Sequence, residues 1–225
     1  MTVKKLYAGT DYTFKVIAYG KTSAGKVYNS DSFAIISSGT KPVAPKFTSF
    51  SQTTSSVTLK WSKVKGADGY RIYMYNGKTQ KYEKIKTLVG TNHKVLKLNA
   101  GTAYKFKIRA YKKSDGVNLW SAESAVFTAA TKPDKPRITD IVAGKGKVLL
   151  SWSNVSGENG YEVYCSDKKD GEYKAIALYK ADVLQCFKSN LISGKEYYFK
   201  VRAYKLVGGV KIYSSYSSAK SILIK

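Results

Sequence analysis

Cysteine is scarce in this sequence. Only two of the 225 residues are cysteines, Cys165 and Cys186, and both lie in the last third of the chain. One pair cannot supply the disulfide framework that stabilises many small secreted domains, so hydrophobic packing must hold the structure together. A Cys165–Cys186 bridge and two buried free thiols both fit the count. The sequence favours the thiols, because cysteine commonly serves as a small apolar core residue.

Side chains that carry catalytic or metal chemistry are also few. The chain has a single histidine, His93, and 15 acidic residues. One histidine and two cysteines cannot assemble a zinc site. Acids sit mainly in turns, as in Asp68-Gly69, and lysines interrupt the acidic turn at residues 167–172, which makes calcium binding there the weaker interpretation. No glycine loop opens a helix to cradle phosphate. The sequence predicts a non-catalytic chain without metal or cofactor, with His93 a structural residue in a strand.

Long apolar runs are missing as well. No stretch is long enough to cross a bilayer as a helix, and the first ten residues lack the apolar centre of a secretory signal peptide. The sequence therefore predicts no membrane span. It says little about location, because the chain is expected to start within a repeat.

Basic residues are abundant. Lys and Arg number 39, which gives a formal charge of +24 and a pI of about 9.8. Such an excess favours anionic partners, including nucleic acid, phospholipid or acidic wall polymer. No basic helix, zinc cluster or ribonucleoprotein motif accompanies it, so no specific nucleic-acid recognition is predicted. Most lysines occupy outward strand positions, where charge also keeps sheets from aggregating.

One segment recurs three times. Residues 98–111 read LNAGTAYKFKIRAY, residues 6–19 read LYAGTDYTFKVIAY, and residues 191–204 read LISGKEYYFKVRAY. The copies start 98 − 6 = 92 and 191 − 98 = 93 residues apart, which is the size of a small domain and too long for a solenoid repeat. Strict alternation from each tyrosine onward predicts a half-buried strand.

Prolines mark the boundaries between repeats. Thr-Lys-Pro occurs at residues 40–42 and 131–133, and a second proline follows each time, at Pro45 and Pro136. Paired prolines stiffen a connection and suit an edge strand. We therefore expect a partial repeat at residues 1–41 and full domains at 42–132 and 133–225. The partial repeat should hold strands at 12–19 and 31–38, joined by a loop over 20–30.

Each full unit reads as a β-sandwich. Period-two strands at residues 56–62 and 70–75 recur around Trp152 and at 161–166, and Trp61 lies 91 residues before Trp152. Seven short strands with turns every eight to twelve residues and no helical period are typical of a sandwich.

These motifs together resemble fibronectin type III repeats. The family pattern combines a buried tryptophan, a Tyr-x-Ile/Val strand and a Leu-x-x-Gly-x-x-Tyr corner. It is met in one unit by Trp61, Tyr70, Ile72, Leu98, Gly101 and Tyr104, and in the next by Trp152, Tyr161, Val163, Leu191, Gly194 and Tyr197. The resemblance implies an all-β chain, in which a partial repeat is followed by tandem immunoglobulin-like sandwiches of seven strands each.

The resemblance also implies roles for single residues. Trp61 and Trp152 should fill the cores, and Tyr12, Tyr104 and Tyr197 should be tyrosine corners whose hydroxyls bond the backbone a few residues upstream. The variant is similar to repeats of surface and secreted proteins of Gram-positive bacteria, which implies an extracellular or cell-surface parent protein.

Two activities of related repeats are not implied. Residues 120–124, WSAES, resemble the tryptophan-serine box of cytokine receptors, but the second tryptophan and the receptor disulfides are missing. An Arg-Gly-Asp tripeptide is absent from the sequence. Trp120 is expected to stack on its own hairpin, over Arg109.

The candidate binding surface is the outer face of one sheet in the second unit. If Tyr70, Ile72, Tyr104, Phe106 and Ile108 point inward, alternate residues must point outward together. These are Arg71, Tyr73, Tyr75, Lys105, Lys107, Arg109 and Tyr111. Aromatic rings among cations can hold sugars or anionic polymers, although exposed tyrosines also pair across strands under lysine stems.

Two functions therefore stand. The first is a non-catalytic spacer or interaction array that positions other domains of a larger bacterial surface or secreted protein, or mediates protein contacts. The second is an adhesion module that binds carbohydrate or anionic wall polymer.

Overall fold

The computed structural model describes residues 2–225 and builds them from strands alone, without an α-helix. Eighteen strands are assigned. The described residues therefore contain no helix that is long and apolar enough to cross a membrane. The all-β class predicted from the sequence is confirmed.

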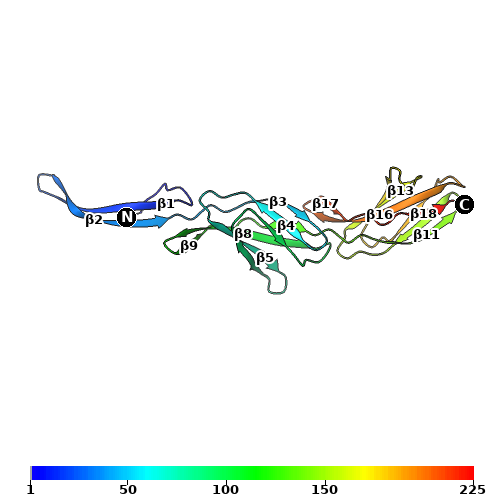
Figure 1. The fold of residues 1–225 in the computed structure, drawn as a ribbon, viewed down its shortest axis with the longest axis horizontal. Coiled ribbons are helices and arrows are strands. Elements are labelled where there is room, and N and C mark those ends of the chain that lie inside the picture. Colours follow the sequence, from blue (N-terminus) through cyan, green and yellow to red (C-terminus); the bar gives the residue numbers. More distant parts are fainter. Residues whose placement is uncertain (1) are drawn as a thin grey trace. The chain divides into compact units, whose positions relative to one another are not determined.

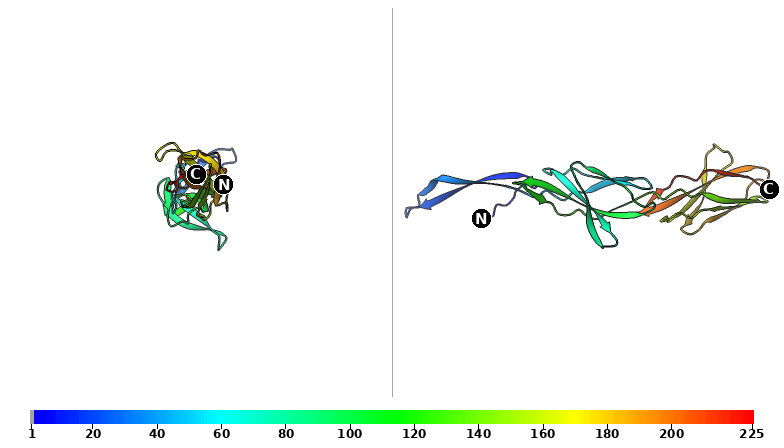
Figure 2. Two further views of the ribbon diagram at one scale, coloured as in Figure 1. Left: turned by 90° about the vertical axis from the view of Figure 1, so that its right-hand side faces the viewer. Right: turned by 60° about the horizontal axis from the view of Figure 1, so that its bottom comes forward.

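The first two strands form a long antiparallel ribbon (blue in Figure 2). β1 (Asp11–Lys21) pairs with β2 (Val27–Gly39), with one irregularity in register between Ile17 and Tyr19. The predicted loop at 20–30 is wrong in extent, because residues 27–30 belong to β2. Thr22 closes a shorter turn: its carbonyl accepts the Gly25 N–H at 2.9 Å and its Oγ1 accepts the Lys26 N–H at 3.1 Å.

Residues 42–132 contribute two sheets. The first has the order β3 (Phe47–Gln52), β4 (Val57–Trp61), β7 (Asn92–Val95). The second has the order β10 (Phe127–Ala130), β8 (Ala103–Ser114), β5 (Gly69–Asn76), β6 (Lys81–Leu88), and β9 (Val117–Trp120) also pairs with β8. Figure 1 shows β8 beside β5 and β9.

Residues 133–225 repeat this order. One sheet runs β11 (Ile138–Gly144), β12 (Lys147–Trp152), β15 (Gln185–Lys188). The other runs β14 (Lys174–Lys180), β13 (Gly160–Ser166), β16 (Glu196–Val207), β17 (Val210–Tyr213), and β18 (Lys220–Leu223) pairs with β16. The two modules therefore share one topology, as the sequence repeat requires.

Eight strand segments replace the seven predicted, because the last strand of each module is broken between two serines. In the gap between β9 and β10, the Ser121 and Ser124 hydroxyls accept the N–H groups of Ala110 and Ile108 at 2.9 and 3.1 Å. Their own N–H groups donate to the carbonyls of the same two residues. Ser214 and Ser217 make the equivalent bonds to Ala203 and Val201. In β8, the N–H groups of Ala110 and Ile108 thus donate to serine hydroxyls where a regular sheet would offer main-chain carbonyls. The backbone hydrogen bonds of β8 are therefore satisfied across the break.

The predicted core tryptophans are buried. Trp152 is 2 % exposed and packs with residues of both sheets of the last module, including Leu150, Tyr161 and Phe199. Trp61 is 3 % exposed, and its ring lies 5.5 Å from that of Tyr70 on β5. Both indole Nε1 atoms lack a hydrogen-bond partner among the described residues. The two rings therefore act by packing alone.

All three tyrosine corners are confirmed. The hydroxyls of Tyr12, Tyr104 and Tyr197 accept the backbone N–H of the residue five positions upstream, at 2.7, 2.8 and 3.3 Å. A second tyrosine bond also repeats: the hydroxyls of Tyr70 and Tyr161 accept the N–H six positions upstream, at 2.8 and 2.9 Å.

The chain divides into two compact units. One holds Met1–Ser49, Lys60–Asn92 and Lys105–Phe127, and the other holds Phe50–Leu59, His93–Tyr104 and Thr128–Lys225. This division crosses strands such as β4 and β8 instead of falling at a proline joint. Because the strands are continuous across it, we keep the boundaries at residues 42 and 133 as a proposal.

Candidate functional site

The predicted binding surface lies on the outer side of the sheet β6-β5-β8-β9. Antiparallel pairing of β5 with β8 sets Arg71 opposite Arg109 and Tyr73 opposite Lys107. The alternate residues Ile72 and Ile108 are fully buried, so the side chains between them must point outward. We call this surface the cation–aromatic face. It consists of Arg71, Tyr73, Tyr75, Tyr82, Lys105, Lys107, Arg109 and Trp120.

Six of the seven residues predicted for this surface are exposed or half-buried. The prediction is wrong for Tyr111, which is 8 % exposed. Its ring lies 5.0 Å from that of Trp120, and a Cβ added at Gly69 would lie 2.6 Å from its hydroxyl. Tyr111 therefore fills the space over Gly69 and offers no ring to a ligand. Tyr204 has the same relation to Gly160 in the last module.

Trp120 is the centre of the face. The expected contact with Arg109 is present, with Cζ 5.8 Å from the ring centroid, but Arg71 lies closer, at 4.1 Å. The Nε of Arg109 donates to the Ser121 carbonyl at 2.8 Å, and the Nε of Arg71 donates to Thr87 Oγ1 at 3.1 Å. Two guanidinium groups are thus held against one indole.

Intramolecular cations also cover the tyrosines farther along the face. Lys107 Nζ lies 4.5 Å from the Tyr82 ring centroid and 2.7 Å from the Glu123 carboxylate. The hydrogen bond to Glu123 raises the pKa of Lys107. Lys105 Nζ lies 5.8 Å from the Tyr75 ring. Because the rings already hold lysines, the face offers a partner mainly positive charge.

The equivalent face of the last module contains an ion network that the sequence analysis missed. Glu162, 9 % exposed, accepts from Tyr164 and Tyr213 at 2.7 and 2.8 Å, from Arg202 at 2.7 Å and from Lys211 at 3.0 Å. Burial raises the pKa of this carboxyl, but these hydrogen bonds outweigh it and hold the value at about 2. The Arg202 guanidinium also stacks 3.6 Å from the Tyr213 ring centroid. The sequence did contain a signal for this network: Glu162 stands at the position in the last repeat that Arg71 occupies in the repeat before it.

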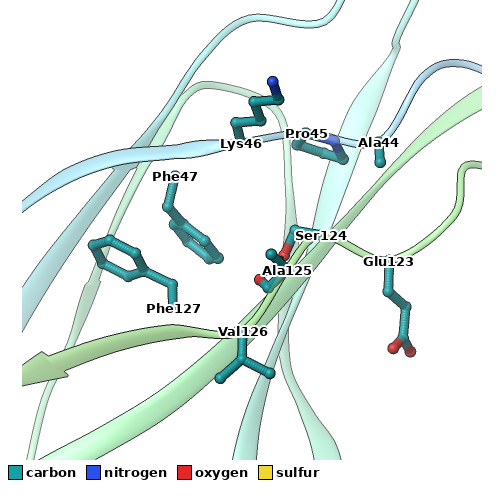
Figure 3. A pocket seen from close by; sticks show the side chains of 9 residues that line it. All are labelled: Ala44, Pro45, Lys46, Phe47, Glu123, Ser124, Ala125, Val126 and Phe127. Atoms are coloured by element: carbon teal, nitrogen blue, oxygen red, sulfur yellow. Dashed lines mark hydrogen bonds between the residues drawn. The ribbon is translucent and has the colours of Figure 1, made fainter.

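A shallow groove of about 330 Å³ lies between the chain before β3 and the broken strand (Figure 3). Phe47 and Phe127 stack in it with centroids 4.8 Å apart, and Lys46 and Glu123 stand at its sides. A groove of about 280 Å³ occupies the equivalent place around Pro136. Since Pro45 and Pro136 cannot donate a backbone hydrogen bond, we interpret both grooves as a result of the proline joint.

Reactive side chains are not gathered on these modules. Among residues 2–225, no cluster of three histidines, cysteines or acids could hold a metal ion. His93 is half-buried in β7. Cys165 and Cys186 are free thiols; Cys186 is buried as predicted, but Cys165 is only half-buried. Burial raises the pKa of Cys165 to about 11 and also raises that of Cys186. Both are therefore protonated and unreactive at neutral pH.

Sequence comparison identifies the module type. Residues 42–127 match the family model of the fibronectin type III domain. These residues are a fibronectin type III domain. Residues 133–225 repeat its strand order, its buried tryptophan and its tyrosine corner.

Relatives of the chain are long proteins. Human fibronectin type-III domain-containing protein 3A is 29 % identical over 92 % of this chain. Chitinase A1 of Niallia circulans is 33 % identical over 57 % of the chain, and exoglucanase B of Cellulomonas fimi is 28 % identical over 77 %. The chain spans less than a fifth of each relative: 18 %, 19 % and 16 %.

Among solved structures, a segment of two fibronectin type III domains from chicken tenascin aligns with a TM-score of 0.47 and 16 % identity. It covers 81 % of this chain and 98 % of that chain. The FN1–FN3 domains of chicken CNTN1 align with a TM-score of 0.43, over 98 % of this chain.

Proposed function

We propose that this chain is a non-catalytic array of fibronectin type III modules that positions other domains of a larger extracellular or cell-surface protein, or mediates its protein contacts. The observation that carries the proposal is the complete repetition of one module. Each copy has its own buried tryptophan, tyrosine corner and pair of sheets. Such modules can be added in series without a change in their internal packing.

Two further observations support the array. Cys186 is buried and Cys165 is half-buried, both as free thiols, and no group of three histidines, cysteines or acids among residues 2–225 could hold a metal ion. The aligned relatives that carry enzyme names, chitinase A1 and exoglucanase B, are matched over only 19 % and 16 % of their length. By analogy, we propose that any activity of the parent protein resides in other domains, and that its partners include those domains.

Single-molecule pulling of the whole chain tests the array. If residues 42–132 and 133–225 are separate domains, the force trace should show two unfolding events, each adding about 30 nm of contour length for about 90 residues. Replacing Trp152 with Ala should lower the force of one event and leave the other unchanged. A single event of twice the length would show one cooperative body and contradict the array.

A second candidate function is favoured by the cation–aromatic face. Residues 42–132 carry 17 Lys and Arg against 4 Asp and Glu, whereas residues 133–225 carry 16 against 9. The net charge is therefore 17 − 4 = +13 on the module that bears this face and 16 − 9 = +7 on the other, because the first module has fewer acids. We propose that this module binds carbohydrate or anionic wall polymer, in addition to its role in the array.

A further inference from the structure

The two modules differ at the centre of an otherwise repeated surface. In the last module, Glu162 and Arg202 face each other across β13 and β16, and their side chains form an ion pair at 2.7 Å. In the fibronectin type III domain at 42–127, the same two positions hold Arg71 and Arg109. The last module therefore has the carboxylate of Glu162 at this position, whereas the other module has the guanidinium of Arg71.

Like charges directly opposite each other on one face destabilise a sheet. No ion pair of residues 2–225 involves Arg71 or Arg109. Three of the four acids of residues 42–132 are engaged elsewhere. Asp68 accepts the Lys113 N–H, Glu83 bonds Asn76 and Thr79, and Glu123 bonds Lys107. The two guanidinium charges are therefore not neutralised by these acids.

The guanidinium groups are fixed before a ligand arrives. Both lie against Trp120, whose ring also packs on Tyr111, and each Nε is engaged by Thr87 or the Ser121 carbonyl. The hydrogen bonds of the described residues include no terminal nitrogen of either arginine. Terminal guanidinium nitrogens match the two oxygens of a carboxylate, and fixing them in advance lowers the cost of binding.

Comparison with the last module indicates a third hydrogen-bond donor for a bound carboxylate, in addition to Arg71 and Arg109. There the Tyr164 hydroxyl donates to the same Glu162 oxygen that Arg202 binds, at 2.7 Å. Tyr73 occupies the position of Tyr164 and is half-buried on the face. We propose that Arg71, Arg109 and Tyr73 bind a carboxylate of a linear acidic polysaccharide, in the position that the Glu162 carboxylate occupies in the last module.

Two features favour a polysaccharide over an acidic peptide. Arg109, Lys107 and Lys105 follow each other along β8 at every second residue, about 7 Å apart, so a regularly charged polymer can meet several of them. Three of the four aromatic rings of the face, those of Trp120, Tyr75 and Tyr82, already hold cations, which leaves little apolar surface for peptide side chains. A carboxylate is favoured over a phosphate because the group at the equivalent position is a carboxylate. This inference deepens the second candidate function and does not depend on the array.

The test is calorimetric titration of the whole chain with oligogalacturonate at about 0.15 M NaCl, where dispersed surface charge is screened. The fully methyl-esterified oligomer is the matched ligand, since it keeps the sugar rings and removes the charge. We expect saturable binding of the acid and none of the ester. Arg71→Glu, which reproduces the Glu–Arg pair of the last module, should weaken binding about tenfold or more and leave the fold intact.

Lys60→Glu is the matched control variant, because it makes the same change of charge at an exposed position on β4, in the other sheet. It should change affinity by about twofold at most. If both variants lost the same affinity for oligogalacturonate, the proposed site around Arg71 would be wrong, although the module would still be a polyanion-binding module. No binding by the unaltered chain would overturn both. Tighter, Arg71-dependent binding of polyphosphate or polyglutamate would overturn the assignment to an acidic polysaccharide.

Discussion

At the scale of single residues, Glu162 shows how a charge is accommodated on a sheet surface. The residue is only 9 % exposed, and four side chains donate hydrogen bonds to its carboxylate. Burial of a carboxylate without such partners would raise its pKa. Here the pKa is held at about 2, well below the ordinary value of 4.5. The network therefore contributes stability only while Glu162 is ionised.

This gives a prediction for the pH dependence of stability. Because the folded pKa lies below the unfolded one, the contribution of Glu162 is complete above about pH 4.5 and is lost as pH falls through about 2. Glu162→Gln should destabilise the last module by about 2–3 kcal/mol at pH 7 and flatten its stability between pH 2 and 4.5. Urea unfolding with hydrogen exchange at the β16 amides measures both effects. An unchanged slope against pH would contradict the role of Glu162.

At the scale of elements, the broken last strand is the feature that most distinguishes these modules from a regular ladder. Ser121 is 1 % exposed, and its hydroxyl accepts the N–H of Ala110, which is itself fully buried. A main-chain donor left without an acceptor in that position is costly. The serines are therefore structural parts of the sheet.

Ser121→Ala tests this role. The change leaves the Ala110 N–H unsatisfied and should lower the free energy of unfolding of this module by about 1–3 kcal/mol. Ser62→Ala, at an exposed position of the same module, should change it by less than about 0.5 kcal/mol. Chemical denaturation of the unaltered chain, Ser121→Ala and Ser62→Ala measures the difference in the free energy of unfolding. Equal stability of all three would mean that water replaces the serine hydroxyl.

At the scale of the whole molecule, residues 1–41 are the part that lacks a core. Val16 is 53 % exposed, whereas the residues at its repeat positions, Ile108 and Val201, are fully buried. Phe33 and Ile35 on β2 are also more than half exposed. An isolated two-stranded ribbon is marginally stable in water. We therefore keep the proposal that residues 1–41 are part of a repeat whose facing sheet lies elsewhere.

Deletion of residues 1–39 tests this proposal. Both later modules should keep their denaturation midpoints, and the shortened chain should be more soluble, because exposed apolar strand surface is removed. In the intact chain, the β1 and β2 amides should exchange far faster than those of β8 and β16. Loss of cooperative folding after the deletion would show that the ribbon completes a downstream sheet and that the boundary at residue 42 is wrong.

The sequence by itself determined the features that depend on local geometry. Period-two alternation placed most strands, and the tyrosine corners followed because their hydrogen bonds span only five residues. Burial of Trp61 and Trp152 followed from their repeat spacing and the family pattern. Six of the seven surface residues were also identified, since alternate side chains of a strand must share a face.

Tertiary structure decided which side chains meet across the sheet. Arg71 and Trp120 lie 49 positions apart, and only the register of β5, β8 and β9 brings them together. The same register covers Tyr111 and sets Arg71 opposite Arg109, while its repeat sets Glu162 opposite Arg202. Alternation assigns a residue to a face, but its neighbours on that face come from strands far away in sequence. The sequence places Arg71 and Glu162 at the same repeat position, but the groups that face each of them became visible only in the folded chain.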